Sequence, residues 1–333
     1  MPISRRAFLS SAAASSILGS AAASFGSAGG AVAGRAGGRG PDSAKSPTTA
    51  PAHTPADGGA RTLRKAVMFG MIADDGVKTI AEKFALLRDC GYDGVEMDSP
   101  SDWKADEVQA AMEKTGIVVH GLVDSAHWGK PLNHPSDKIS GAGLAALETC
   151  LKDAKSLGCS SILLVPGVVN NDLPYDECYT RSQAMIKKAL PLARECGVKI
   201  AVENVWNGFL LSPLEAARYV DDFADAMMAF HFDIGNVINF GRPAQWVKIL
   251  GQRIAKLHIK DFSLKKRDSE GLWKGFSVEL GDGDAGWKDV MAALDATGYS
   301  TAKVGNWATA EVGGGDRERL KEVARRMDVI LGA

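Results

Sequence analysis

From Thr62 to its C-terminus the chain repeats one pattern, in which an apolar run of strand length precedes an amphipathic segment of helix length. This alternation is typical of α/β folds with parallel strands. The predicted strands are Lys65–Met71, Gly94–Asp98, Val118–Val123, Ser161–Val165, Lys199–Asn204, Ala229–Ile234, Ala255–Asp261 and Trp307–Val312. The predicted helices are Thr79–Cys90, Asp106–Lys114, Gly143–Leu157, Tyr175–Cys196, Pro213–Phe223, Pro243–Leu250, Trp287–Thr297 and Asp316–Leu331.

A succession of eight β/α units predicts a single (β/α)8 TIM barrel, in which both faces of every strand are buried. The competing arrangement is a doubly wound open sheet, which usually has a glycine-rich phosphate-binding loop after its first strand. Residues 71–76 read MIADDG and do not form such a loop. Leu264–Asp284, between the seventh predicted strand and its helix, is long and rich in Gly, Asp and Lys, so we interpret it as a candidate lid.

The N-terminal region differs in composition from the rest of the chain. Arg5 and Arg6 precede a weakly apolar Ala/Ser/Leu stretch and small-residue triplets that a signal peptidase could accept. This resembles a twin-arginine signal peptide, and it predicts cleavage of residues 1–33, a twin-arginine translocase as export partner and a periplasmic or otherwise exported protein. Residues 34–61 predict a flexible linker, which leaves 62–333 for the barrel. A disordered low-complexity tail is the alternative interpretation of the N-terminus.

Charge and composition exclude several classes of partner. The 333 residues include 39 Lys+Arg and 40 Asp+Glu, and a net charge of −1 argues against a nucleic-acid-binding protein. No strongly apolar run is long enough to predict a stable membrane span. The five cysteines lie at packing positions between helices and strands, which predicts buried thiols rather than disulfides. The oligomeric state stays open, a homo-oligomer included.

Four titratable residues lie near the C-terminal ends of consecutive predicted strands, where TIM barrels place their chemistry. They are Glu203, Asp233, His258 and Glu311, each in an otherwise apolar run. A buried carboxylate is costly unless it is paired or bound to a metal. The convergence of three carboxylates and one imidazole therefore predicts one divalent metal ion. This donor set suits Mn²⁺, Mg²⁺ or Co²⁺, and Zn²⁺ stays open.

The same residues carry a family resemblance. The motifs VENVWN with Glu203, FDIGN with Asp233, LHIKD with His258 and ATAEV with Glu311 resemble the xylose isomerase-like TIM-barrel superfamily, and within it the sugar phosphate isomerases and epimerases. The resemblance covers the predicted barrel and is most specific over residues 199–262. It implies that the four residues bind one divalent metal ion. It also implies that the two glutamates act as acid and base on opposite faces of a sugar.

Three positions depart from the pattern of the ketose 3-epimerases. Where those enzymes have a further glutamate, a histidine and an arginine, this chain has Phe209, Asn236 and Leu264. The metal chemistry that the resemblance implies therefore transfers to this chain, whereas the identity of the substrate does not.

Two charged residues on predicted strands are candidate substrate contacts. Glu96 interrupts an apolar run on the second predicted strand, and Lys260 shares a strand face with His258. For Glu96 and Lys260 an ion pair with a neighbouring group is the alternative. His231 lies nearer the middle of the barrel, where we expect core packing.

The other candidate substrate contacts lie in loops at the carboxyl end of the predicted barrel. His127 and Trp128 follow the third predicted strand, where an indole could form an apolar wall for a sugar, or the pair could anchor the loop. The remaining candidates follow the metal-ligand motifs and are Asn204, Trp206 and Asn236.

The combined prediction is an isomerase, either a sugar epimerase or an aldose–ketose isomerase. Proton transfer next to a carbonyl would pass through an enediolate stabilised by the metal, with Glu203 and Glu311 as acid and base. The alternative that keeps the metal is a lyase or dehydratase acting on a 3-keto sugar or keto-glycoside. A non-catalytic carbohydrate-binding barrel would not need the two glutamates. A metal-dependent endonuclease would need more than the six histidines present and a basic groove. Which sugar is bound, and whether it is phosphorylated, stays open.

The export prediction can be tested at Arg5 and Arg6. Replacing both with lysine should keep the precursor in the cytoplasm, because the twin-arginine pathway reads the arginine pair rather than its charge alone. Cell fractionation followed by immunoblotting measures the outcome, with the unaltered precursor as the control. Undiminished export of the double variant would contradict the twin-arginine interpretation.

Overall fold

The computed structural model describes residues 60–302 and 306–332. The predicted signal at 1–33, and the predicted linker as far as residue 59, lie outside the described residues. Among the helices of the described ranges, none has both the length and the apolar character that crossing a membrane requires.

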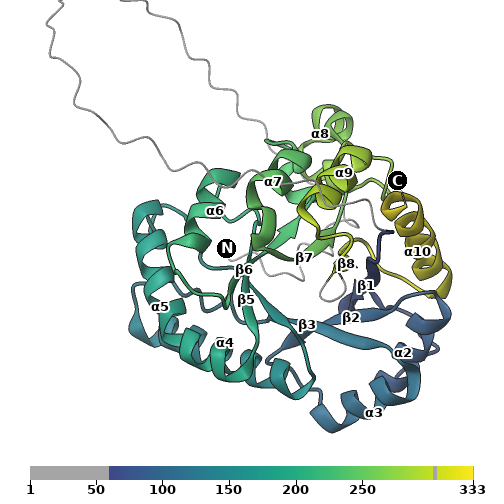
Figure 1. Cartoon of the computed structure of the whole chain (residues 1–333), viewed down its shortest axis with the longest axis horizontal. Helices are drawn as coiled ribbons and strands as arrows, with labels where there is room; N and C mark the ends of the chain where they lie inside the picture. Colours follow the sequence, from purple (N-terminus) through teal and green to yellow (C-terminus); the bar gives the residue numbers. More distant parts are fainter. Residues whose placement is uncertain (1–59, 303–305, 333) are drawn as a thin grey trace, which may run out of the picture.

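The described residues form eight parallel strands that close into a barrel in chain order, so that β1 pairs with both β2 and β8 (Figure 1). The strands are β1 (Arg64–Met68), β2 (Gly94–Ser99), β3 (Val118–Asp124), β4 (Ser161–Leu164), β5 (Lys199–Glu203), β6 (Met228–Asp233), β7 (Ile254–Ile259) and β8 (Trp307–Ala310). Each overlaps a predicted strand, and the predicted TIM barrel is confirmed.

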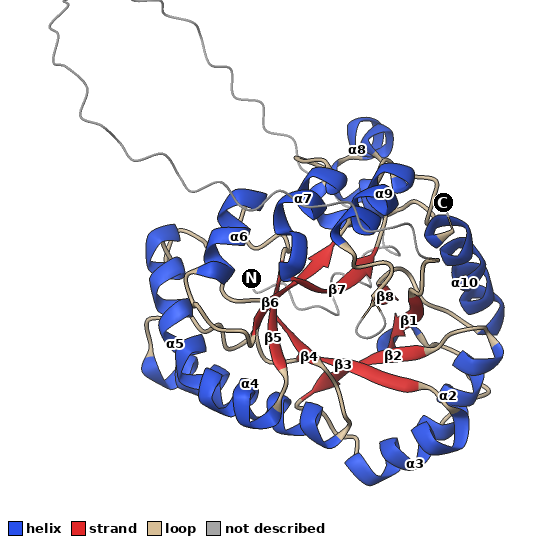
Figure 2. Cartoon of the chain, viewed as in Figure 1, coloured by secondary structure: helices blue, strands red, loops and turns tan. Residues whose placement is uncertain are grey.

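Helices surround the strands on the outside of the barrel (Figure 2). They are α2 (Ile80–Asp89), α3 (Ala105–Thr115), α4 (Asp137–Ser156), α5 (Tyr175–Cys196), α6 (Pro213–Asp221), α7 (Pro243–Leu250), α8 (Leu264–Glu270), α9 (Trp287–Thr297) and α10 (Arg317–Leu331). Short 3-10 helices are η1 (Phe69–Met71), η2 (Gly235–Val237), η3 (Gly251–Arg253) and η4 (Leu272–Phe276). Because the helices cover the outer faces, strands such as β4 and β6 are buried along their whole length.

Local sequence sets several helix ends. Thr79 and Glu82 form a reciprocal capping box at the start of α2, each side chain accepting a hydrogen bond from the other residue's backbone N–H. The last residues of α3, α5 and α9 are followed by Gly116, Gly197 and Gly298, which have left-handed conformations with φ of 73°, 68° and 77°. These signals are local, so the helix boundaries could be predicted closely from sequence.

The start of α4 differs from the prediction. The sequence predicts this helix over Gly143–Leu157. The helix begins at Asp137, and Gly143 lies within it. A Cβ atom on Gly143 would lie 2.2 Å from the carbonyl oxygen of Lys130, so this glycine allows a loop to pack directly on the helix. Tertiary packing therefore accounts for a glycine inside the helix.

Leu264–Asp284, predicted as a long loop, contains α8 and η4. The buried carboxylate of Asp261 holds the far end of this segment. It accepts hydrogen bonds from the backbone N–H groups of Gly281, Gly283 and Ala285 and from the indole of Trp287, at 3.0–3.2 Å. The segment is therefore anchored to the end of β7 rather than being a loop without structure of its own.

The cysteines are all free thiols, as predicted. Those buried in the barrel are Cys90, Cys150, Cys159 and Cys178, while Cys196 is half-buried. Burial raises the pKa of the Cys159 thiol to about 12, so this group stays protonated at neutral pH.

The packing of η4 gives a stability prediction. A Cβ atom on Gly275 would lie 2.2 Å from the ring of Phe262, so we expect Gly275→Ala to lower the free energy of unfolding by about 1–3 kcal/mol through overpacking. Urea unfolding measures this. Gly141→Ala in α4 is the matched control, because nothing lies within 4 Å of its new Cβ atom and alanine favours helix. Equal losses in the two variants would contradict the assigned packing.

Candidate metal centre

Four strands bring the predicted ligands together at the carboxyl end of the barrel. Glu203 ends β5, Asp233 ends β6, His258 lies one residue before the end of β7, and Glu311 directly follows β8. Asp233 and His258 are direct partners in the β6–β7 register. One ligand atom from each of the four residues lies within 4.8 Å of all the others. The structure thus places the four predicted ligands in a single cluster.

Close polar contacts connect the cluster. Nδ1 of His258 lies 2.8 Å from Oε1 of Glu203 and 3.2 Å from Oε2 of Glu311. Nζ of Lys260 lies 2.8 Å from Oδ2 of Asp233 and 2.8 Å from Oε2 of Glu311. Each of these cationic or ionisable nitrogens therefore bridges two carboxylate groups.

Burial and neighbouring charge oppose each other throughout the cluster. Burial raises the pKa of Glu203, although the neighbouring His258 acts to lower it. Burial likewise raises the pKa of Asp233, although the neighbouring Lys260 acts to lower it. Burial lowers the pKa of His258, but Glu311 and Glu203 outweigh it, and the pKa is raised well above its usual value. Lys260 behaves likewise, since Asp233 and Glu311 outweigh burial and raise its pKa. The surroundings favour positive charge at this point in the barrel.

The residues present fit a divalent metal ion. Three carboxylates and one imidazole form the oxygen-rich donor set that Mn²⁺, Mg²⁺ and Co²⁺ accept. Oδ2 of Asp233 is buried, and the Lys260 ammonium lies 2.8 Å from it, so this oxygen already faces a cation. An acceptor in this state is suited to a cation. The four residues Glu203, Asp233, His258 and Glu311 could hold such an ion.

Two asparagines fix the position of Asp233. Asn204 donates from Nδ2 to the Asp233 carbonyl at 2.8 Å, and its Oδ1 accepts from the Asp233 N–H at 2.9 Å. The N–H of Asn236 donates to Oδ1 of Asp233 at 2.9 Å, and its Nδ2 donates to the Asn204 carbonyl at 3.0 Å. The indole of Trp206 donates to the Asn236 carbonyl at 2.8 Å. These three predicted substrate contacts thus support Asp233 through a chain of hydrogen bonds.

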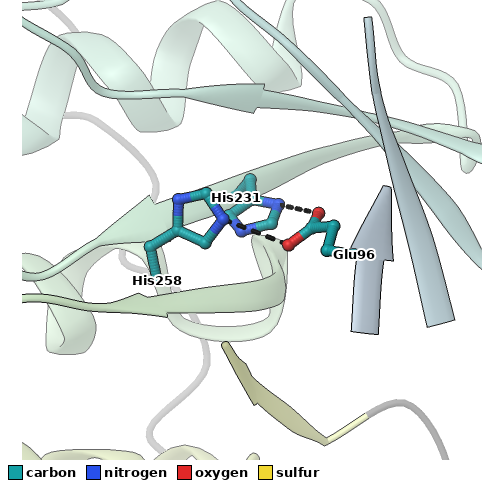
Figure 3. A group of neighbouring side chains, drawn as sticks. All are labelled: Glu96, His231 and His258. Atoms are coloured by element: carbon teal, nitrogen blue, oxygen red, sulfur yellow. Dashed lines mark hydrogen bonds and ion pairs between the residues drawn. The ribbon is translucent and has the colours of Figure 1, made fainter. Parts of the chain in front are cut away.

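Glu96 lies behind the cluster, 1% exposed, and contacts two histidines (Figure 3). Its Oε2 is 3.1 Å from Nε2 of His258, and its Oε1 is 3.8 Å from Nδ1 of His231. His231 is fully buried, as expected for core packing, and its ring packs against that of His258 with centroids 4.2 Å apart. The sequence did not indicate the contact between Glu96 and His258, because β2 and β7 are distant in the chain and are not neighbours in the barrel.

His127 and Trp128 lie together after β3. His127 is 3% exposed, and its Nδ1 accepts a hydrogen bond from the Val165 N–H at the end of β4, at 3.3 Å. The rings of His127 and Trp128 meet edge to face with centroids 5.6 Å apart. The structure shows how the pair anchors its loop to the neighbouring strand.

An aromatic group, of which the sequence analysis identified only Trp206, lies near Lys260, whose Nζ is 5.7 Å from the centroid of the Phe276 ring. Trp206 lies 5.0 Å from Trp273 and 5.0 Å from Phe276 between ring centroids, and Phe262 completes the group. We call these four side chains the aromatic wall. Trp273 is 49% exposed. A tryptophan in a segment already interpreted as a candidate lid was the signal available in the sequence. A neighbouring cavity of about 220 Å³ is lined by Trp206, Asn204 and Asn236 together with Phe209 and Phe240.

Comparisons with known proteins agree with this architecture. The profile of a family described as "Xylose isomerase-like TIM barrel" matches residues 84–328. A curated relative, the uncharacterized protein MJ1311 of Methanocaldococcus jannaschii, is 22% identical over 170 residues, which are 49% of this chain and 56% of that protein. The chain thus matches just over half the length of this relative.

Solved structures of several sugar epimerases have the same fold. L-ribulose 3-epimerase superposes with a TM-score of 0.66 at 15% identity, over 81% of this chain and 95% of that chain. D-psicose 3-epimerase superposes with a TM-score of 0.63 at 15% identity, over 81% of this chain and 100% of that chain. The 3-keto-D-glucoside 4-epimerase YcjR of E. coli superposes with a TM-score of 0.64 at 16% identity, over 82% of this chain and 100% of that chain. At these identities the likeness establishes the fold.

The contacts of Lys260 give a third prediction. Lys260→Met would leave Asp233 and Glu311 without their shared ammonium, so we expect the metal-free variant to lose about 3–5 kcal/mol of stability. Its affinity for Mn²⁺ should rise, because a competing cation is gone. Chemical unfolding with and without EDTA, and titration with Mn²⁺, measure the two effects.

Lys256→Met is the matched control for this prediction. Lys256 is also buried, but its Nζ donates to the Ser160 hydroxyl at 2.8 Å rather than to the four clustered residues. Its removal should leave the Mn²⁺ affinity unchanged. An unchanged affinity in Lys260→Met as well would show that this ammonium does not compete with metal.

Proposed function

The chain belongs to the xylose isomerase-like TIM barrel family, and we propose that it is a divalent-metal-dependent sugar epimerase or isomerase. The observation that carries the proposal is the convergence of Glu203, Asp233, His258 and Glu311 within 4.8 Å of one another at the carboxyl end of the barrel. The epimerase names of the structural neighbours support the same class of reaction.

Two glutamates in one cluster suit proton transfer at a carbon next to a carbonyl. Glu203 and Glu311 come from β5 and from the end of β8, so they approach the cluster from different strands. Each carboxylate has two oxygens, and one can take part in cation binding while the other accepts or donates a proton. One glutamate removes the proton from the substrate carbon, and the other returns a proton from the opposite face. Return to the same carbon gives epimerisation, and return to the neighbouring carbon gives isomerisation.

The remaining residues bind and orient. A divalent metal ion, when bound, supplies Lewis acidity that stabilises negative charge on the substrate oxygens. Lys260 places a positive charge between Asp233 and Glu311, where it also offers hydrogen-bond donors to a substrate oxygen. Burial of the cluster excludes water, which strengthens each of these electrostatic contacts.

The aromatic wall and the export prediction both bear on the substrate class. Apolar ring faces such as that of Trp206 pack well against the C–H face of a sugar. The twin-arginine pattern at Arg5 and Arg6 extends the proposal to an exported enzyme. An exported enzyme meets free sugars and glycosides more often than phosphorylated sugars, which are chiefly cytoplasmic. We therefore propose a non-phosphorylated sugar or glycoside as substrate.

The division of labour between the glutamates provides the test. Glu203→Gln and Glu311→Gln should each reduce turnover by about 10²–10⁴-fold, since each removes one acid/base group. In D₂O, an epimerase variant should still exchange solvent deuterium into the epimer whose proton faces the surviving glutamate. The two variants should therefore prefer opposite epimers. Mass spectrometry and NMR of a panel of ketoses, keto-glycosides and phosphosugars, with the Mn²⁺-loaded protein, measure exchange and its position.

Glu113→Gln on the exposed face of α3 is the control, and it should behave as the wild type. If one glutamate governs exchange and the other governs loss of a substituent, the enzyme is an eliminating lyase rather than an epimerase. Near-normal turnover of both glutamine variants at full Mn²⁺ occupancy would exclude the two-glutamate mechanism.

A further inference from the structure

The two ring nitrogens of His258 face different parts of the barrel. Nδ1 faces the clustered carboxylates, 2.8 Å from Oε1 of Glu203, whereas Nε2 lies 3.1 Å from Oε2 of Glu96. We propose that Glu96 is a positioning residue for the metal centre. It accepts a hydrogen bond from Nε2–H of His258 and thereby keeps Nδ1 as the nitrogen that binds the metal. This inference rests on the metal binding in the proposed function.

The chemistry of the two groups fixes the direction of this hydrogen bond. An ionised carboxylate can only accept, so the ring nitrogen beside Glu96 has to carry the proton. Without a metal, Nδ1 also faces carboxylate oxygens, at 2.8 Å from Glu203 and 3.2 Å from Glu311, so both ring nitrogens can donate. A metal ion that took Nδ1 would displace the proton there, and the imidazole would keep its one remaining proton on Nε2, facing Glu96. Histidines that bind metals generally donate their other N–H to a carboxylate or carbonyl in this way, which fixes both tautomer and ring orientation.

The position of Glu96 is built into the barrel. β2 and β7 are not neighbours in the barrel, so Glu96 reaches His258 across its interior (Figure 3). Gly121 is the partner of Glu96 in the β2–β3 register, and a Cβ atom there would lie 3.3 Å from Oε1 of Glu96. The register also shifts between Val95 and Glu96. A glycine and a local irregularity therefore give the carboxylate its space at this depth.

His231 is the neighbour that could support a different interpretation. Its Nδ1 is 3.8 Å from Oε1 of Glu96, too far for a hydrogen bond, and neither ring nitrogen has a hydrogen-bond partner within residues 60–302 and 306–332. Ligand atoms of Glu96, His231 and His258 lie within 4.8 Å of one another, which is close enough for a second metal ion. That ion would need Nε2 of His258 as a ligand, and Nε2 could not then donate to Glu96. The short contact between His258 and Glu96 favours the positioning role.

The first experiment measures Mn²⁺ affinity in the full chain after removal of bound metal. Glu96→Ala removes the acceptor and should weaken Mn²⁺ binding by about 10–100-fold. Glu96→Gln retains an oxygen that can accept from Nε2–H, so its affinity should lie between those of Glu96→Ala and the wild type. Electron paramagnetic resonance of free Mn²⁺ gives the affinity and the number of ions bound per chain. Glu96→Gln keeps the test valid if Glu96→Ala does not fold.

A matched control separates positioning from the general loss of a buried carboxylate. Asp124 at the end of β3 is also 1% exposed, and its Oδ1 accepts a hydrogen bond from the Ala126 N–H at 2.9 Å. Asp124→Asn can change thermal stability, but its Mn²⁺ affinity should equal that of the wild type. The Glu96 variants should change both the thermal stability and the Mn²⁺ affinity.

The second experiment observes the tautomer directly. Long-range ¹H–¹⁵N NMR of the Mg²⁺-loaded wild type should show one imidazole with a protonated Nε2 and a metal-shifted Nδ1, and His258→Asn should remove and so assign this signal. The Nε2–H resonance should move in Glu96→Gln and broaden or vanish in Glu96→Ala. Protonation of Nδ1 instead would overturn the proposal.

The outcomes distinguish this inference from the proposed function. A wild-type chain that binds no Mn²⁺ contradicts the proposed function and this inference together. Binding of Mn²⁺ that is equally tight in the wild type and Glu96→Ala contradicts the inference alone. Two Mn²⁺ ions per chain, of which one is lost in His231→Phe, would place a metal ion beside Glu96 and likewise overturn the inference.

Discussion

Repulsion among three carboxylates in the barrel interior is the constraint on which the rest of the site depends. Two unit charges about 4 Å apart repel by about 4 kcal/mol at the effective dielectric of a protein site, so Glu203, Asp233 and Glu311 cannot share this space without a cation. The fold supplies positive charge through Lys260 and His258, which lie within 3.2 Å of these carboxylates. The cluster is therefore a cation site before any metal arrives.

The same constraint links stability to metal binding. Lys260 reaches the carboxylates because Gly235 has no side chain, and a Cβ atom there would lie 2.7 Å from the lysine stem. A divalent ion held by the oxygens of Asp233 and Glu311 would repel this ammonium. A bound metal ion would therefore take the place of the Lys260 ammonium rather than fill a neutral cavity. The net free energy of metal binding is then smaller than the charge of the ion alone suggests.

Sequence predicts the parts of this site that depend on local periodicity, and it fails where contacts cross the barrel. The ligands Asp233 and His258 could be placed because each lies at the end of an apolar run, and parallel strands align such ends. The contact between Glu96 and His258 could not be predicted, because it joins β2 to β7 and depends on the closure of the barrel. The glycine at position 143 likewise could not be explained from the sequence, because the reason for it is the close approach of the Lys130 carbonyl oxygen in the folded chain.

The candidate metal centre and the aromatic wall lie in different parts of the fold. The candidate metal ligands lie on paired strands or directly after them. The aromatic wall comes instead from the segments after β5 and β7, where Trp206 contacts Trp273 and Phe276. Asp261 anchors the second of these segments and is not one of the four candidate ligands. Loops vary more than the elements they connect, so the length and side chains of this segment can change independently of the clustered carboxylates. The departures at Phe209 and Leu264 lie in these same segments, so the resemblance at the four candidate ligands supports the proposed chemistry but not the identity of the sugar.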